Sequence, residues 1–222
     1  MIPEAEWWIE KDGKITCLLC PHYCLLSDCD AGVCGVRIAV DGKLTLPGYG
    51  KLTAAAADPV EKKPLYHFHP GESVWSVGFA GCSMSCPFCQ NHRISMAGPS
   101  EGVFRSPEDV VNDTLACGSG ILAFTYSEPT VHFEYLLRTA GIAHDSGLKT
   151  VLVTNGNLNL KPAQNLLSVM DAVNIDLKSW DEAYYKKVLN GRLNTVKAFI
   201  EESLARNWVE ITTLVVPGDN DD

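Results

Sequence analysis

The sequence lacks any run of about 20 apolar residues, the length that a helix needs to cross a membrane. Its first residues, MIPEAEWWIEKDGK, include acidic side chains and have no continuous apolar core of the kind found in signal peptides. Dense clusters of lysine and arginine are also missing, and the net charge is −9. Broad electrostatic binding to nucleic acid or to an anionic membrane is therefore not expected. We expect a cytoplasmic protein.

Internal repeats and low-complexity segments are absent as well. A length of 222 residues suits one domain, or one domain with a small appendage, and 46% hydrophobic residues suffice for a buried core. The nine cysteines are an odd number and cluster at the spacings of metal ligands. Disulfide frameworks belong to small secreted domains, so these thiols fit a reducing compartment.

The most informative cysteines are Cys82, Cys86 and Cys89, in the run CSMSCPFCQN at C-x3-C-x2-C spacing. The apolar segment 74–81 before them indicates a buried strand, which places the cysteines on the loop at its carboxyl end. Thiolates are the usual ligands of iron–sulfur clusters, and a four-iron cluster held by three of them leaves one iron free to bind a reactant. With His92, the same cysteines also match a closed four-ligand zinc site. The rest of the chain favours the cluster.

From residue 74 onward, apolar strand-like runs alternate with helix-like segments, which predicts a parallel sheet with crossover helices. We expect strands at 74–80, 121–126, 150–154, 172–177 and 209–216, and helices at 107–116, 130–146, 161–169 and 181–206. Ser106 followed by Pro107 marks the start of the first helix. Because the carboxyl ends of parallel strands share one face, the polar residues that follow them should face the same pocket as the cysteines.

Residues 1–70 lack long periodic segments and are predicted to form a small Cys-rich region, with the α/β domain at 71–222. Short strands are expected at 14–18, 36–40 and 43–46, and Asp41-Gly42 should be the hairpin turn between the last two. Four thiolates in this region can close a zinc site or hold a second cluster; they are Cys17, Cys20, Cys24 and Cys34. Cys29 is an alternative to Cys34. We favour zinc, because a small region with little core needs a staple.

Three other residues deserve an interpretation. His67 and His69, in the run YHFHP, are candidate ligands or substrate contacts, but packing between the two regions is the favoured explanation. Cys117, at the end of a predicted helix, is expected to be a buried small residue rather than a ligand.

The spacing C-x3-C-x-aromatic-C, with Phe88 at the aromatic position, resembles the radical SAM superfamily. The runs PFCQN and DPVEKKPLYHFHPG look like its pyruvate formate-lyase activating enzyme-like branch, and most like the radical SAM member of the AmmeMemoRadiSam system. The resemblance extends from Cys17 to Asn220 and implies a partial (β/α) barrel of the TIM type. The chain stops where the family continues into a further helix and strand, so we expect a barrel truncated at its C-terminus, either a fragment or a protein whose open edge a partner covers.

The resemblance implies an oxidoreductase that uses a [4Fe–4S] cluster and S-adenosylmethionine (SAM). An electron donor of the flavodoxin or ferredoxin type reduces the cluster, and SAM is cleaved to a 5′-deoxyadenosyl radical that abstracts hydrogen from a substrate. A glycyl residue of a protein is one implied substrate. The alternative function is an inactive or truncated metal-binding scaffold that needs a partner.

Two acidic positions and one lysine match the SAM-binding motifs of the family. Glu128 lies where the GGE motif places an acid on the methionyl ammonium, although Tyr126 and Ser127 replace the two glycines. Asp176 and Lys178 match the D-x-K motif and resemble contacts to a ribose hydroxyl and to the methionyl carboxylate. The alternatives are a first-turn helix acid for Glu128 and a solvated charge pair for the other two.

Asn155 and Phe88 complete the implied cofactor site. Asn155 resembles a ribose contact at the end of the third parallel strand, although Asn155-Gly156 also reads as a simple turn. Phe88 resembles an adenine contact, or alternatively a shield for the cluster.

Overall fold

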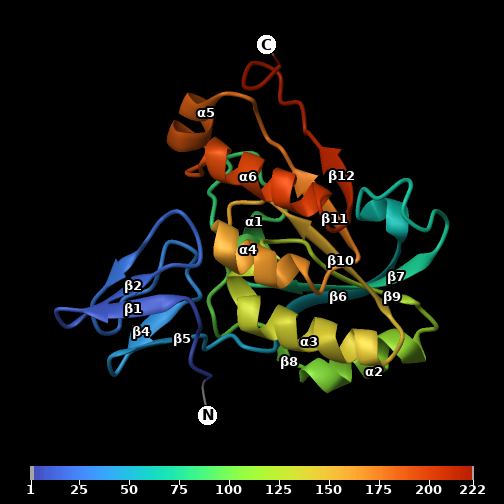
Figure 1. Cartoon of the computed structure of the whole chain (residues 1–222), viewed down its shortest axis with the longest axis horizontal. Helices are drawn as coiled ribbons and strands as arrows, with labels where there is room; N and C mark the ends of the chain where they lie inside the picture. Colours follow the sequence, from blue (N-terminus) through green and yellow to red (C-terminus); the bar gives the residue numbers. More distant parts are fainter. Residues whose placement is uncertain (1–2, 222) are drawn as a thin grey trace.

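Five parallel strands form the centre of the structure, a computed structural model that describes residues 3–221 (Figure 1). In spatial order they are β12 (Trp208–Thr212), β11 (Ala172–Asp176), β10 (Lys149–Thr154), β9 (Ile121–Thr125) and β7 (Ser73–Phe79). Two antiparallel pairings extend the sheet, of β6 (Lys51–Pro59) with β7 and of β8 (Val103–Phe104) with β6. This parallel-dominated α/β sheet confirms the predicted fold class. All five expected strands are present, but the last ends at Thr212 rather than at residue 216.

Helices cover one face of this sheet (Figure 1). They are α2 (Pro107–Ala116), α3 (Phe133–Asp145), α4 (Leu160–Leu167) and α6 (Leu193–Leu204). Ser106 caps α2 as expected, and Ser106 and Asp109 exchange two hydrogen bonds of 3.0 Å in a capping box. Shorter helical segments are η1 (Val60–Lys62), α1 (His92–Ser95), η2 (Pro129–His132) and α5 (Glu182–Lys187). Within residues 3–221, none of the helices combines the length and apolar composition needed to span a membrane.

The helix expected over residues 181–206 is wrong, because the chain forms two helices, α5 and α6, with a tight turn between them. Asn190 has a φ of +54° in this turn. A Cβ on Gly191 would stand 2.7 Å from Cε of Met84, so a larger residue there would require the Met84 side chain to move. The backbone N–H of Ser85 also donates to the carbonyl oxygen of Leu189 at 3.0 Å. The break thus lets the turn pack against the cysteine loop.

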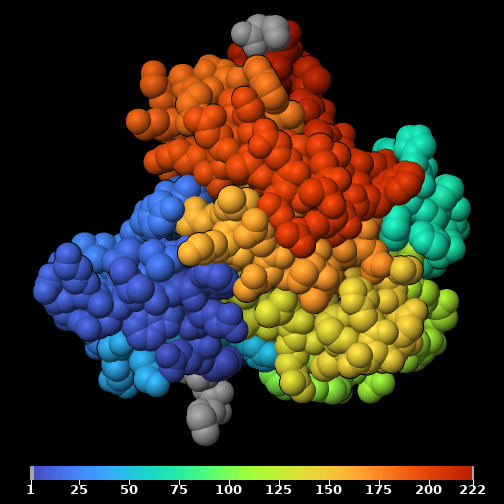
Figure 2. All heavy atoms as spheres, in the orientation of Figure 1, coloured from blue at the N-terminus to red at the C-terminus, as the bar shows by residue number. Residues whose placement is uncertain are grey.

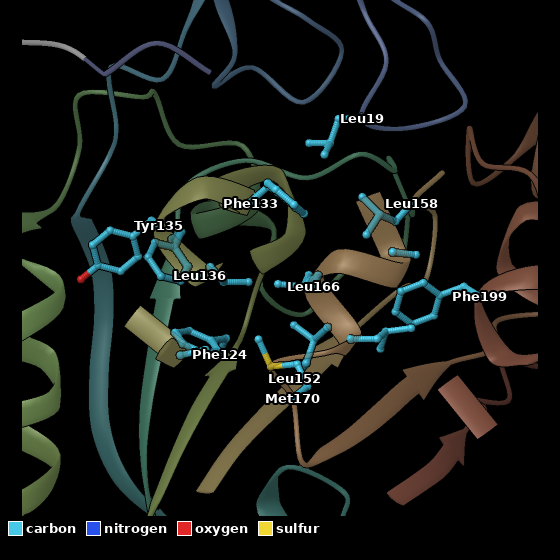
Figure 3. Packing of buried hydrophobic residues seen from close by; sticks show 14 of the residues in the cluster. Leu19, Phe124, Phe133, Tyr135, Leu136, Leu152, Leu158, Leu166, Met170 and Phe199 are labelled. Atoms are coloured by element: carbon cyan, nitrogen blue, oxygen red, sulfur yellow. The ribbon is translucent and has the colours of Figure 1, made fainter. Parts of the chain in front are cut away.

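Alternating side chains of the strands bury both faces of the sheet. Phe124 and Leu152 face the helices, where they join one large cluster with Leu136 and Leu166 (Figure 3). Their neighbours along the strands point the other way, and Ile121, Ala123 and Val151 pack with Val60 and Leu65 of the segment after β6. Burial on both faces is why these strands are almost continuously apolar.

The N-terminal region forms small sheets beside the main sheet (Figure 1), and its atoms are the blue part of the surface in Figure 2. Its elements are β1 (Trp8–Lys11), β2 (Lys14–Cys17) and β3 (Leu25–Leu26), followed by a hairpin of β4 (Ile38–Val40) and β5 (Lys43–Thr45). Asp41 and Gly42 form the expected turn, with φ values of +50° and +75°. Leu19 extends from this region into the large core cluster, near Phe133 and Leu158 (Figure 3).

One strand on the N-terminal side of the predicted boundary at residue 70 belongs to the main sheet. β6 lies within the expected Cys-rich region, yet it is paired with β7 along most of its length in the main sheet. Its run of four alanines has no preference for a strand, so no local pattern predicts this strand. The division at residue 70 stays a prediction.

Candidate functional site

The loop after β7 carries the three predicted cluster cysteines. It starts at Gly81, which has a φ of +89°. A Cβ on Gly81 would stand 2.6 Å from the carbonyl oxygen of Cys34, so this glycine lets the loop lie directly against the N-terminal region. Farther along, the N–H of Met84 donates to Sγ of Cys82 at 3.4 Å, and Asn91 Nδ2 donates to the carbonyl oxygen of Tyr126 at 2.7 Å. Both ends of the loop are therefore anchored.

The thiols of Cys82, Cys86 and Cys89 are all partly buried. Cys86 lies within electrostatic range of both other thiols. Burial raises the pKa of Cys82 and of Cys86, since a thiolate loses its hydration there, and these groups ionise readily only beside a cation or metal. Ser95 Oγ lies 3.7 Å from Sγ of Cys89. Three thiols on one loop, with N–H and O–H groups near the sulfurs, fit the donor set of an iron–sulfur cluster.

Asn155 stands next to this loop at the end of β10. Its Nδ2 lies 3.7 Å from Sγ of Cys82 and donates to Oγ of Ser83 at 3.3 Å. Its Oδ1 accepts the N–H of Asn157 at 2.8 Å, which is the hydrogen bond of an Asx turn. The two interpretations of Asn155 are therefore compatible, because one end of the amide closes the turn while the other faces the cysteine loop.

Glu128 follows β9 and is completely buried. Its Oε1 accepts hydrogen bonds from the hydroxyls of Thr130 and Thr154 at 2.6 and 2.7 Å, and its Oε2 accepts the N–H of Asn155 at 2.8 Å. Burial raises the pKa of Glu128, and these hydrogen bonds oppose that effect. The side chain thus ties the end of β9 to the end of β10, beside Cys82. It also caps η2 by accepting the N–H of Thr130.

Asp176 and Lys178 form an ion pair at the end of β11, with Nζ 3.0 Å from Oδ2. Burial lowers the pKa of Lys178, but Asp176 and Cys86 more than compensate and leave it above its usual value. The lysine side chain is 18% exposed and the aspartate side chain 40%, so the ammonium is largely withdrawn from water while the carboxylate stays partly accessible. Lys178 is also within electrostatic range of Cys82. A fixed cation therefore faces the cysteine loop.

Phe88 is partly buried and packs against the large core cluster. Beside Lys178, a surface hollow of about 410 Å³ opens between the ends of β11 and β12, lined by Leu177, Ser179, Trp180, Asp181, Thr213 and Asn220. Its size is typical of sites that hold small ligands. The hollow adjoins the carboxyl ends of the strands, where the other predicted residues lie.

Tyr126, which the sequence shows only as a departure from a Gly-Gly motif, has a structural role. Its φ is +75°, so it keeps the backbone conformation that glycine adopts easily. Its ring packs against Gly78, where a Cβ would stand 2.6 Å from it. Its hydroxyl donates to Asp58 at 2.8 Å, and the ammonium of Lys63 lies 4.5 Å from its ring centre. These contacts offset the strain of the left-handed conformation.

The remaining candidates lie elsewhere. The prediction that His67 and His69 are packing residues is wrong, because their side chains are 78% and 40% exposed and pair with Glu210 and Glu72. Cys117 is exposed rather than buried. Its sulfur lies 3.1 Å from the carbonyl oxygen of Thr114.

Four of the five N-terminal cysteines lie close together, and the fifth, Cys29, lies apart from them. Cys17, Cys20, Cys24 and Cys34 lie within electrostatic range of one another. Cys29 is exposed and contacts Asp28, so the structure brings Cys34 into the group. Among residues 3–221, no three Cys, His, Asp or Glu side chains already stand around one point as in a formed metal site. Binding a metal would therefore draw the thiols of either group closer together.

Comparison with known proteins gives the family. Residues 76–222 match the model of the radical SAM superfamily. The uncharacterized protein MJ0808 of Methanocaldococcus jannaschii is 38% identical over 215 residues, which cover 95% of this chain and 63% of that protein. The chain therefore spans less than two thirds of this curated relative.

Two solved structures are similar over part of their length. TYW1 with a lysine-pyruvate adduct bound is 22% identical, with a TM-score of 0.48 over 67% of this chain and 57% of that one. QueE from Escherichia coli is 13% identical, with a TM-score of 0.44 over 74% of this chain and 84% of that one. Since the family model covers well over half of the residues, this chain belongs to the radical SAM superfamily.

Proposed function

We propose that this protein is a radical SAM oxidoreductase of the pyruvate formate-lyase activating enzyme-like branch. Radical SAM proteins use a [4Fe–4S] cluster and SAM. The observation that carries the proposal is that Cys82, Glu128, Asn155 and Lys178 meet at the carboxyl ends of four adjacent parallel strands. The runs PFCQN and Asp176-Leu177-Lys178 support the finer assignment. The proposed substrate is a glycyl residue of a protein.

Cys82, Cys86 and Cys89 would hold the cluster, and Lys178 and Asp176 would bind SAM beside it. When bound, the cluster and SAM supply a one-electron cleavage that yields a radical able to abstract a hydrogen atom. The ammonium of Lys178 would pair with the methionyl carboxylate, because it is already fixed and faces the cysteines. Asp176 would accept a hydrogen bond from a ribose hydroxyl.

Glu128 and Asn155 would hold the other end of the cofactor. Oε2 of Glu128 accepts one hydrogen bond, and a carboxylate oxygen has room for a second. The methionyl ammonium would take that place, while the bonds from Thr130 and Thr154 keep the carboxylate fixed. Asn155 would bind the ribose. Phe88 would pack on the adenine and limit the entry of water. A donor of the flavodoxin or ferredoxin type would deliver the electron.

The test is anaerobic reconstitution with iron and sulfide, followed by dithionite and SAM. We expect the absorption of one oxygen-sensitive [4Fe–4S] cluster and the release of 5′-deoxyadenosine and methionine, measured by liquid chromatography. Cys82→Ala should abolish both, whereas Cys117→Ala, at an exposed thiol far along the chain, should change neither. Colourless protein with zinc at the three cysteines would refute the proposal. An intact cluster that never cleaves SAM would instead favour a metal-binding scaffold.

The proposal that the substrate is a glycyl residue is tested separately, by isotope labelling. A candidate partner protein grown with α-deuterated glycine should transfer deuterium to the 5′-deoxyadenosine. If the amount of 5′-deoxyadenosine rises in proportion to the added partner but the product carries no deuterium, a different hydrogen is removed. The assignment to the activating enzyme-like branch then fails.

A further inference from the structure

The four N-terminal cysteines come together although 17 positions separate the first from the last along the chain. Cys17 ends β2, and its N–H donates to the carbonyl oxygen of Cys24 at 3.0 Å. The sulfurs of Cys24 and Cys34 flank buried Gly32, at 3.6 and 3.8 Å from the point where its Cβ would stand. Cys20 lies within electrostatic range of the other three thiols. The fold therefore gathers these four thiols, and only these, in the N-terminal region.

Backbone groups lie near the sulfurs of this group. The backbone of Leu19, His22 and Val36 lies close to the thiols of Cys17, Cys20 and Cys34, in each case two residues after the cysteine. The N–H of Val33 donates to Sγ of Cys24 at 3.4 Å. Such hydrogen bonds stabilise a thiolate more than a neutral thiol, and they fix the direction of a ligand around a metal. In the cysteine loop, the N–H of Met84 likewise donates a hydrogen bond to Sγ of Cys82.

A buried cation stands beside the group. The guanidinium of Arg37 is 1% exposed and lies within electrostatic range of Cys17 and Cys34. Glu134 and two backbone carbonyl groups satisfy its terminal nitrogens, but within residues 3–221 its Nε has no hydrogen-bond partner. A divalent ion with four thiolates carries a net charge of −2, and this guanidinium, although already paired with Glu134, would offset part of that charge. The surroundings are thus suited to an anionic metal complex.

The turn that carries these N-terminal cysteines contacts the cysteine loop after β7. His22 Nε2 lies 2.7 Å from the carbonyl oxygen of Ser83, and Gly81 packs against the backbone of Cys34. On the other side, Asn159 donates to the carbonyl oxygens of Leu18 and Leu19 at 2.7 and 3.0 Å. The strands here have only two to four residues, so they supply little core of their own. A metal would contribute directly to their folding.

We propose that one zinc ion is bound by four thiolates, those of Cys17, Cys20, Cys24 and Cys34, which release their protons to solvent. The bound ion holds the turn on which the cysteine loop rests. A single ion needs no room beyond the four sulfurs, whereas a four-iron cluster must also fit four sulfides. The assignment is independent of the proposed catalytic function, because the two groups of cysteines do not share a residue.

The test uses the full chain with Cys82, Cys86 and Cys89 all changed to alanine, purified in air. This variant cannot hold the catalytic cluster, so its metal content reports the N-terminal site alone. We expect about one zinc ion per chain and four sulfur neighbours at about 2.3 Å by zinc X-ray absorption. Adding Cys17→Ser and Cys20→Ser should lower the zinc content at least tenfold. Adding Cys29→Ser instead, at the exposed cysteine outside the group, should leave it unchanged.

Each other result overturns the proposal. Metal-free, folded protein would show that the thiols stay protonated and that packing alone holds the turn. Iron and sulfide in place of zinc would show a second cluster. Nitrogen or oxygen neighbours in the absorption spectrum would reject the four-thiolate set. That spectrum needs only the folded parent variant, so it decides the ligand set even if the serine variants fail to fold.

Discussion

Replacing Glu134 with glutamine should destabilise the protein far more than the loss of an ordinary surface charge. Arg37 donates to both oxygens of Glu134, at 3.0 and 2.8 Å, and the two side chains are 1% and 10% exposed. The pair joins the N-terminal region to α3 next to the four cysteines. Glutamine keeps the shape and one acceptor but removes the charge, which leaves the buried guanidinium without its paired carboxylate.

The expected loss follows from that geometry. Removing one partner of a buried pair costs about 3–5 kcal/mol, and glutamine should lie near the lower limit because it still accepts one hydrogen bond. At roughly 2–4 °C per kcal/mol for a chain of this size, about 3 kcal/mol corresponds to a fall in Tm of roughly 6–12 °C. The matched control is Glu4→Gln. Glu4 contacts Lys43 at 2.6 Å, but both side chains are about half exposed, so the loss should stay below about 1 kcal/mol.

Anaerobic urea unfolding, followed by tryptophan fluorescence, measures both variants. The midpoint of Glu134→Gln should shift at an unchanged slope, and added salt should reduce the effect of Glu4→Gln only, since buried pairs are weakly screened. If the two variants lie within about 1 kcal/mol of each other, the Arg37–Glu134 pair is not the electrostatic link between the regions and the reasoning fails.

Three further outcomes are expected. Lys178→Met should weaken SAM binding to the reconstituted protein by roughly 10- to 150-fold, the value of one charged hydrogen bond, and equilibrium dialysis that finds parental affinity would remove Lys178 from the site. Burial raises the pKa of Asp58, but hydrogen bonds from Lys62, Lys63 and Tyr126 outweigh it and hold the pKa well below its ordinary value of 3.8. Its contribution to stability is therefore present above about pH 4 and lost as the pH falls further, so Asp58→Asn should flatten the acid side of the stability profile measured by urea unfolding between pH 3 and pH 7. Gly81→Ala should lower the Tm more than Gly13→Ala, since both glycines have positive φ but only Gly81 faces backbone at 2.6 Å, and equal losses in scanning fluorimetry would contradict the close approach.

The sequence determined the parts of this protein that depend on local pattern. Apolar runs predicted all five parallel strands, because strands buried on both faces are continuously apolar. The Ser106-Pro107 start placed α2 correctly, and Asp41-Gly42 placed a hairpin turn. The spacing of three cysteines identified the family. Each of these signals lies within about ten neighbouring residues, where side-chain chemistry and backbone geometry constrain each other directly.

Other features depended on contacts between distant segments. The turn between α5 and α6 packs Gly191 against Met84, about a hundred residues earlier, and β6 is a strand because it pairs with the edge of β7. Burial makes Glu128, which the family motif predicts as a SAM contact, a link between β9 and β10 as well. The choice of Cys34 over Cys29 was open in the sequence, since both spacings allow a ligand. Only the folded chain, which buries one thiol beside the others and leaves the second in water beside an aspartate, decided between them.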